Sequence, residues 1–155
     1  MTAPQRDAIR SFCVRLLSRR EYSRFELKER LGGQGWSGRE VDEVLDELAS
    51  EGWQSDERFA QEYSRMRIRK GNGSVRICHE LRERGIEGAP LDDLIQDLYG
   101  GWEELIEHVH HKRFGDAPLN SYPERARRSR FLQHRGFTPE QIRTLFARIA
   151  PSRRS

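Results

Sequence analysis

The hydrophobic positions of this chain recur with a period of about 50 residues. Gly35, Gly85 and Gly136 each have a leucine four residues before them and a bulky apolar residue directly after them. Apolar residues then follow each glycine at offsets +6, +9, +10 and +13, as Val41, Val44, Leu45, Leu48, as Leu91, Leu94, Ile95, Leu98 and as Ile142, Leu145, Phe146, Ile149. This spacing places the four side chains on one helical face. The pattern therefore predicts a helix that ends at each glycine, in a left-handed C-cap, and an amphipathic helix after it.

Capping and turn signals complete the secondary structure and predict nine helices and no strand. Helix starts are indicated by capping boxes, by a capping serine before acidic residues, and by a proline in the first turn. Helix ends are indicated by glycine-rich turns. In the first repeat the predicted elements are a helix over about 7–20 and helices opening at the boxes 23–26 and 37–40. They continue with a helix from Ser55 to about Lys70, a turn at Gly71 to Gly73, a helix from Ser74 to about Arg84 and the amphipathic helix that carries Leu91 to Leu98. The last ones are a helix from Trp102 to about Phe114, a loop over 115–121, and helices opening at the boxes 121–124 and 138–141.

A fixed period in a helical chain indicates an array of similar modules that stack because none buries its apolar face well alone. We predict an all-α fold, an elongated array of three tandem three-helix repeats that resemble helix-turn-helix modules. The predicted repeats cover residues 1–52, 53–101 and 102–155. Trp53 and Trp102 stand at the starts of the second and third repeats, where large side chains suit the joints between neighbours.

The composition agrees with a thin helical protein. Of the 155 residues 35% are hydrophobic and 34% are charged, which does not favour a deep interior. The chain has no apolar run approaching 18 residues and no signal peptide, so we expect a soluble, cytoplasmic protein. Cys13 and Cys78 fall in helices of different repeats, and we expect both to be core thiols.

Charge is distributed unevenly along the chain. The net charge is +3, and the last repeat holds the excess, with eleven basic and six acidic residues in 102–155. The third helix of the first two repeats is mostly acidic, whereas the first and second helices carry the arginines. Two interpretations remain open at this point: solvated faces that pair ions internally, or a surface that binds carboxylates or phosphates through planar guanidinium groups.

The sequence shows no arrangement typical of an enzyme. It lacks a glycine-rich phosphate loop, a nucleophile elbow and a His/Cys dyad, and its carboxylates stand on helix faces where nothing raises their pKa. Of His108, His110 and His111 only the first and last share a helix face, and neither cysteine is near, so no zinc site is expected. We expect no catalysis, no cofactor and no metal.

The segment 56–86, DERFAQEYSRMRIRKGNGSVRICHELRERGI, resembles the signature of the RecX family, which regulates the bacterial recombinase RecA. The resemblance rests on the start Asp56 to Ala60, an arginine ladder, the Gly71 to Gly73 turn and the pair Gly85-Ile86. Flanking repeats agree through Glu26-Leu27, Leu31, Trp36, Arg130-Phe131-Leu132 and Arg135-Gly136-Phe137. One departure is Arg128, which stands where the other repeats have Leu27 and Ile77.

The resemblance implies an all-helical crescent that lies in the groove of the RecA–DNA filament. There it would restrain filament growth, ATP hydrolysis, strand exchange and assisted repressor cleavage, in homologous recombination, DNA repair and the SOS response. We expect a monomer that binds the RecA filament on DNA, with weak direct contact to DNA and none to membranes. The residues expected to bind this partner are Arg58, Arg65, Arg67, Arg69, Lys70, Arg76, Arg82, Arg84, Arg125, Arg127, Arg128 and Arg130.

Two other functions fit the residues. Modules of three short helices are typical of helix-turn-helix proteins, so a DNA-binding regulator is the alternative function. A general helical-repeat adaptor is a further one. Helices of alternating charge suit a protein partner that bears both signs better than a bare phosphate backbone, because the acidic helices would repel DNA.

Overall fold

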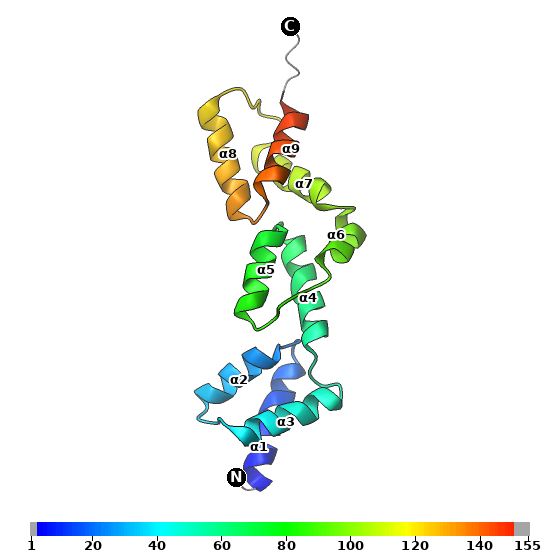
Figure 1. Ribbon diagram of the computed structural model, residues 1–155, viewed down its shortest axis with the longest axis vertical. Helices are drawn as coiled ribbons and strands as arrows, with labels where there is room; N and C mark the ends of the chain where they lie inside the picture. The colour runs from blue at the N-terminus through cyan, green and yellow to red at the C-terminus, as the bar shows by residue number, and fades with distance from the viewer. Residues whose placement is uncertain (1–2, 151–155) are drawn as a thin grey trace. The chain divides into compact units, whose positions relative to one another are not determined.

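The fold is all-α in a computed structural model that describes residues 3–150. Nine helices and no strand in this range confirm the predicted fold class of three-helix repeats (Figure 1). The helices are α1 Ala3–Leu17, α2 Arg24–Gly33, α3 Arg39–Ser50, α4 Asp56–Arg69, α5 Ser74–Glu83, α6 Leu91–Tyr99, α7 Trp102–Phe114, α8 Tyr122–His134 and α9 Pro139–Ile149. The expected elongation stays a prediction.

The described residues form two compact units. Unit 1 consists of residues 3–63 and Leu81–Ala89, and unit 2 consists of Ser64–Glu80 and residues 90–150. The second predicted repeat is therefore shared between the units, and helices α4 and α5 each contribute to both. The repeat boundaries inferred from the sequence stay a prediction.

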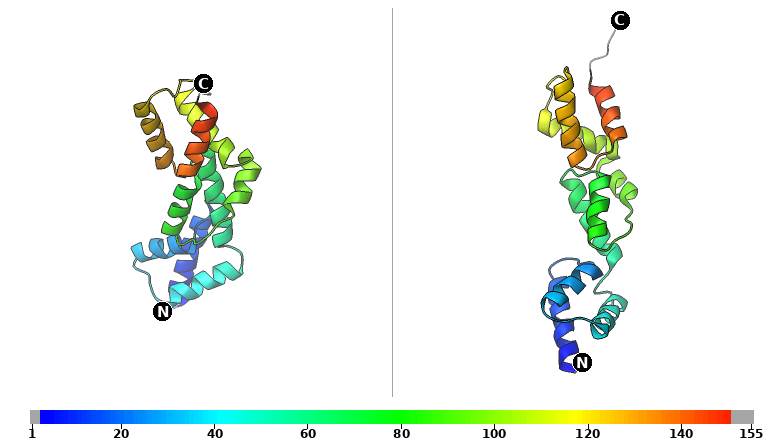
Figure 2. Two further views of the ribbon diagram at one scale, coloured as in Figure 1. Left: turned by 45° about the horizontal axis from the view of Figure 1, so that its top comes forward. Right: turned by 60° about the vertical axis from the view of Figure 1, so that its left-hand side comes forward.

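Unit 1 has its core between α1, α2 and α3, which lie together in all views (Figures 1 and 2). Helix α1 packs mainly on α3, and α2 covers the same apolar face. The core comprises the buried side chains Ile9, Cys13, Leu16, Tyr22, Leu27, Leu31, Val41, Val44, Leu45 and Leu48. All four apolar positions predicted for the third helix of the first repeat are thus buried, and the register of the repeat is confirmed there.

Unit 2 has its core between α7, α8 and α9, with α6 packed against α7 (Figures 1 and 2). Most of its buried apolar side chains come from the positions that the repeat predicts and from α7. They include Leu91, Leu94, Ile95, Leu105, Ile106, Val109, Leu132, Phe137, Ile142, Leu145 and Phe146. Only the last position of the pattern, Leu98 and Ile149, is half-buried.

The three repeat glycines end their helices as predicted. Gly35, Gly85 and Gly136 have φ values of +89°, +80° and +101°. After each glycine a backbone N–H reaches back five residues to a leucine carbonyl, in the Schellman arrangement. These bonds are Trp36 to Leu31 at 3.0 Å, Ile86 to Leu81 at 2.9 Å and Phe137 to Leu132 at 3.1 Å. The left-handed conformation explains why glycine is required at these three positions.

The capping predictions are confirmed in full at two of the four boxes and in part at a third, where Ser121 caps the helix but the Glu124 carboxylate binds Arg127 and Arg128. Ser23 and Thr138 form complete capping boxes, and Ser121 accepts a hydrogen bond from the backbone of Glu124. The box expected at Ser37 is wrong, because the N-cap of α3 is Gly38 and no side chain caps this helix. Gly38 has a φ of +97°, so the chain enters α3 in a conformation in which the Ser37 hydroxyl makes no capping bond.

One expectation about apolar side chains is also corrected. Trp53 is 41% exposed, so it does not fill a joint. The buried face of α4 includes Phe59, Ala60 and Ile68, whereas Met66 is 38% exposed and lies outside this face. Among the helices of residues 3–150, none has the length and apolar character needed to span a membrane. Cys13 is buried, which raises the pKa of its thiol to about 11, and Cys78 is half-buried.

Candidate partner-binding surface

The arginines of the expected surface divide into those that bind within the protein and those that do not. Arg67 belongs to the first group. Its guanidinium donates two hydrogen bonds, of 2.8 and 3.0 Å, to the carboxylate of Glu80, and its side chain is only 16% exposed. This bidentate pair joins the end of α4 to α5 in unit 2. Arg67 therefore stabilises the second repeat and has little surface left for a partner.

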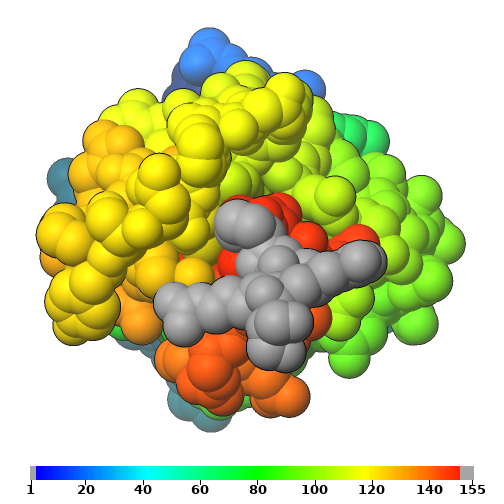
Figure 3. Space-filling view, turned by 90° about the horizontal axis from the view of Figure 1, so that it is seen from above, coloured from blue at the N-terminus to red at the C-terminus, as the bar shows by residue number. Residues whose placement is uncertain are grey.

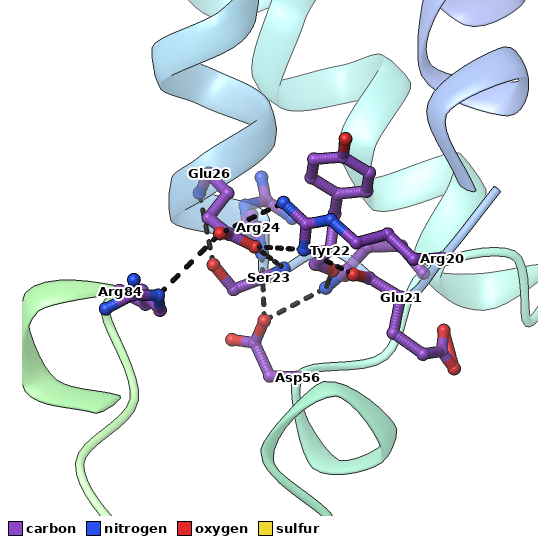
Figure 4. A network of polar contacts seen from close by, with 9 residues as sticks. Arg20, Glu21, Tyr22, Ser23, Arg24, Glu26, Asp56 and Arg84 are labelled. Carbon is purple, nitrogen blue, oxygen red and sulfur yellow. Dashed lines mark hydrogen bonds and ion pairs between the residues drawn. The ribbon is translucent and has the colours of Figure 1, made fainter. Parts of the chain in front are cut away.

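Arg84 and Arg58 make contacts within unit 1. The carboxylate of Glu26, at the first turn of α2, accepts from the Ser23 backbone at 3.1 Å and pairs with Arg84 at 3.9 Å (Figure 4). Arg84 also lies over the ring of Tyr63, 4.7 Å from its centroid. Arg58 pairs with Glu21 at 2.7 Å, and this hydrogen bond raises the pKa of its guanidinium. The two side chains help to hold the first repeat against the start of the second.

Arg76 lies at a close backbone contact in unit 2. The Gly73 N–H donates to the carbonyl of Arg135 at 2.8 Å, and the Val75 N–H donates to the carbonyl of Gly136 at 3.0 Å. The Arg76 side chain donates to the carbonyl of His134 at 3.3 Å. The turn between α4 and α5 is thus bonded directly to the end of α8, and the glycines of the turn allow this approach.

The acidic helix of the first repeat is paired internally. Arginines of α1 and α2 bond to carboxylates along α3, with side chains that are partly exposed. The ion pairs are Arg6 with Glu43 and Glu47, Arg10 with Glu51, and Arg24 with Asp46, at 2.5 to 2.8 Å. The interpretation of internally paired faces therefore holds for this repeat.

Five other basic residues of the expected surface have no ion pair in the described range, and two more are exposed. Within residues 3–150 the structure gives no ion pair to the side chains of Arg65, Arg69, Lys70, Arg82 and Arg130. All are exposed except Arg65, which is half-buried. Arg125 and Arg127 are exposed as well; Arg125 lies over the ring of Phe146, and Arg127 binds Glu124 through two hydrogen bonds. These seven side chains remain candidates for contact with a partner.

Arg128 corrects the expectation, because its side chain is only 1% exposed. It occupies the core position that Leu27 and Ile77 fill in the other repeats. Its guanidinium is bonded to Glu124 at 2.8 Å, to His110 Nε2 at 3.2 Å, and to the carbonyls of Ala117 and Pro118 at 3.1 and 3.2 Å. Hydrogen bonds from Arg127 and Arg128 lower the pKa of Glu124 to about 2. Arg128 fixes the 115–121 loop from within and cannot reach a partner.

The histidines of α7 line a cavity in unit 2. A cavity of about 660 Å³ is lined by His108, His110, His111, residues of the 115–119 loop and Ile149. Figure 3 views this end of unit 2, where the loop between α7 and α8, in yellow, lies beside the end of α9, in red. In the part of the chain that the structure describes, no group of three or more histidine, cysteine or carboxylate side chains is placed to hold a metal ion.

Sequence reasoning missed Arg135. Its Nη1 donates to the carbonyl of Lys70 at 2.8 Å, which caps the end of α4, and its guanidinium lies 5.3 Å from the ring centroid of Phe131. The available signal was its place beside Gly136 in the segment Arg135-Gly136-Phe137, which carried the family resemblance but was not taken as part of a site.

The fold and the exposed cations define a class of protein, a helical-repeat protein whose surface is suited to binding a charged partner. Sequence models of three successive domains match the chain: the first three-helix domain of RecX over residues 10–48, the second over 55–93 and the third over 103–146. The chain belongs to the RecX family of regulatory proteins.

Relatives and solved structures agree with this assignment. A regulatory protein RecX from Halorhodospira halophila is 38% identical over 141 residues, which cover 91% of this chain and 88% of the relative. One from Chromohalobacter salexigens is 41% identical over 138 residues, covering 89% and 90%. The crystal structure of RecX from Lactobacillus salivarius shares the fold, with a TM-score of 0.72 at 19% identity over 96% of this chain and 98% of that one. The relatives' names describe regulation, in agreement with the expectation that the protein is not an enzyme.

Proposed function

We propose that this protein binds the filament that RecA forms on DNA, in its groove, and restrains filament growth, ATP hydrolysis, strand exchange and assisted repressor cleavage. This function would place it in the bacterial cytoplasm, in DNA repair and the SOS response. The family assignment over all three repeats supports the proposal. The relatives' name, regulatory protein RecX, supports a regulatory role.

The observation that carries the choice of surface is the contrast in ion pairing. The arginines of α1 and α2 that face α3 are paired with its carboxylates, whereas Arg65, Arg69 and Lys70 at the end of α4 have no ion pair among residues 3–150. Exposed charges contribute only about 0–1 kcal/mol to folding, but arginines at the centre of an interface contribute about 2 kcal/mol or more to binding. We therefore assign the end of α4 to partner contact.

The test is DNA-dependent ATP hydrolysis by the RecA of the same bacterium, with this protein titrated in. The parent should inhibit hydrolysis. Reversing both charges in Arg65→Glu/Arg69→Glu should weaken inhibition at least tenfold, because repulsion is added to the lost contacts and about 1.4 kcal/mol corresponds to a factor of ten.

A matched control is Arg39→Glu/Arg143→Glu, which reverses two arginines outside the expected surface. Arg39 is 90% exposed and Arg143 is exposed. The control should inhibit as strongly as the parent, and both variants should keep the parent's melting temperature within a few degrees. A folded Arg65→Glu/Arg69→Glu variant that inhibits like the parent would remove this surface from the proposal.

The positive excess of the third repeat favours a second candidate, a DNA-binding regulator. Such a protein would bind duplex DNA without RecA, and its affinity would fall steeply with salt because bound cations release counterions from the phosphates. Fluorescence anisotropy with labelled duplex at two salt concentrations distinguishes the two functions. We expect weak duplex binding, and strong RecA-independent binding would favour the second candidate.

A further inference from the structure

Unit 2 contains a small cavity whose polar lining is basic. It has a volume of about 270 Å³ and lies between the end of α4, the last turns of α7 and the end of α8. Its wall includes Arg69, Lys70, His108, Lys112, Arg113 and Arg135, and no carboxylate within residues 3–150 lines it. The cations come from three helices, so the cavity exists only because the fold brings these helix ends together.

Two guanidinium groups in this wall are held in place by an aromatic ring. The Cζ atoms of Arg113 and Arg135 lie 5.2 and 5.3 Å from the ring centroid of Phe131, within the range of cation–π attraction. Arg135 is further fixed by its 2.8 Å hydrogen bond to the carbonyl of Lys70. Side chains that are already oriented lose less conformational entropy when a ligand binds. The guanidinium groups of Arg113 and Arg135 are therefore preorganised to bind an oxyanion.

The backbone beside the cavity also limits substitution. Gly71 has a φ of +86°, and a Cβ atom there would lie 3.0 Å from Val109 Cγ2 and 3.4 Å from Arg135 Nη1. A Cβ atom at this position would therefore be tight against Val109 and in contact with the guanidinium of Arg135. The positive φ and the tight contact with Val109 both favour glycine at this position.

Helix dipoles account for part of this cluster. Cations near helix C-termini gain about 0.3–1 kcal/mol each, and Arg69, Lys112 and Arg113 stand in last turns. The dipoles do not explain why these three side chains have no ion pair among residues 3–150, while the arginines of α1 that face α3 are paired. Several unpaired cations around one cavity leave a positive field that a ligand with more than one negative charge would neutralise.

We propose that this cavity binds phosphate groups, either two neighbouring phosphates of a nucleic-acid backbone or a free polyphosphate. Phosphate oxygens match the planar forks of Arg113 and Arg135, and Lys112 and Lys70 supply additional positive charge. This proposal does not depend on the proposed function, because the cavity would bind phosphate without RecA. Its test contains no RecA, and a failure of either proposal leaves the other standing.

The experiment uses inorganic pyrophosphate, followed by isothermal titration calorimetry, and a labelled single-stranded oligothymidylate of about twenty nucleotides, followed by anisotropy. Lys112→Gln/Arg113→Gln should weaken pyrophosphate binding at least tenfold. Arg39→Gln/Arg143→Gln, which removes two charges outside the cavity, should bind within twofold of the parent. Circular dichroism checks that each variant is folded, and the single variant Lys112→Gln replaces the double one if that does not fold.

Each outcome decides the proposal. If the cavity variant weakens both ligands, the phosphates belong to a nucleic-acid strand; if it weakens pyrophosphate alone, the ligand is a free polyphosphate. The proposal is overturned if the parent does not bind pyrophosphate, or if the cavity and control variants lose affinity equally. It is also overturned if hexaglutamate competes as well as pyrophosphate does, because the cavity would then be a general anion patch.

Discussion

Gly73 and Gly136 are in direct backbone contact although they lie in different repeats. A Cβ atom built on Gly73 would stand 2.5 Å from the carbonyl carbon and oxygen of Gly136, and one built on Gly136 would collide with the Arg76 side chain. Two hydrogen bonds flank this contact, from Gly73 to Arg135 and from Val75 to Gly136. The helix-ending glycine of the third repeat therefore has a second role, because it admits the turn of the second repeat.

The variant Gly73→Ala should destabilise the protein. Its methyl group would meet backbone, which cannot rotate away, and overpacking of this kind typically costs about 1–3 kcal/mol. Gly32→Ala is the matched control: Gly32 lies in α2, nothing stands within 4 Å of its Cβ position, and alanine is the better helix former, so stability should rise by about 0.5–1 kcal/mol. Urea unfolding measures both. Equal changes in the two variants would contradict the close contact.

The leucine before each repeat glycine should be essential for folding. Leu81 is buried and its carbonyl accepts the Ile86 N–H that ends α5. Leu81→Ala should cost about 2–5 kcal/mol, as truncation in a packed core does. Val75→Ala removes apolar atoms from the same helix at an exposed position and should change stability by less than about 0.5 kcal/mol. A loss below that value for Leu81→Ala would mean that the repeat register is wrong.

The core and the helix ends could be predicted from the sequence because both follow local rules. Period and offset identify Leu31, Leu81 and Leu132, and the cap chemistry at Ser23 and Thr138 acts over four residues. The site could be predicted only in part, since its contacts join distant segments. Arg67 is sequestered by Glu80, thirteen residues further on, and nothing near Arg67 in the chain indicates this.

The prediction that Arg128 lies on the partner-binding surface was wrong because it relied on residue type alone. An arginine in a run of arginines indicates an exposed face, and only the alignment with Leu27 and Ile77 indicated a core position. Its burial is possible because His110 and the carbonyls of the 115–121 loop, all distant from it in sequence, supply hydrogen bonds. The basic cavity was missed for the same reason, since it combines the ends of three helices.

The repeat pattern predicts an elongated molecule, and small-angle X-ray scattering tests this. Compact-domain scaling gives a radius of gyration of roughly 15 Å for 155 residues. We expect a clearly larger value for the monomer, because three thin modules do not pack around one core. Light scattering on the same sample must show a monomer, since a dimer would also raise the radius. A monomer near 15 Å would contradict elongation.

The buried Arg128 should contribute to the stability of the protein through hydrogen bonds that a leucine cannot make. Arg128→Leu restores the residue type of Leu27 but removes the hydrogen bonds to the carbonyls of Ala117 and Pro118 and leaves the buried His110 ring without its partner. A buried polar group without a hydrogen-bond partner costs about 1–3 kcal/mol. Arg127→Leu is the matched control, because Arg127 binds the same Glu124 from an exposed position and should matter little. Thermal unfolding compares them. If both variants melt like the parent, Arg128 does not hold the loop.

His110 should make the stability of unit 2 depend on pH. Its ring lies in a pocket between Phe114, at 5.2 Å, and Phe146, at 6.4 Å, with Arg128 Nη1 3.2 Å from Nε2. Burial lowers the pKa of this imidazole, and the charges of Arg128 and His111 lower it further. In the unfolded chain the His110 imidazole has the ordinary histidine pKa of about 6.5. It therefore takes up a proton at a higher pH in the unfolded chain than in the folded protein.

The sign of the dependence follows from this difference in proton binding. The contribution of neutral His110 to the free energy of unfolding is fully present above about pH 6.5. It is lost as the pH falls from there toward the pKa of His110 in the folded protein, because the unfolded state then binds more protons. His110→Gln keeps a hydrogen-bond acceptor for Arg128 but cannot take up a proton, so its melting temperature should fall less than that of the parent between pH 7.5 and 5.5. His134→Gln, at an exposed position, should follow the parent. Parallel curves for His110→Gln and the parent would show that another group senses the acid.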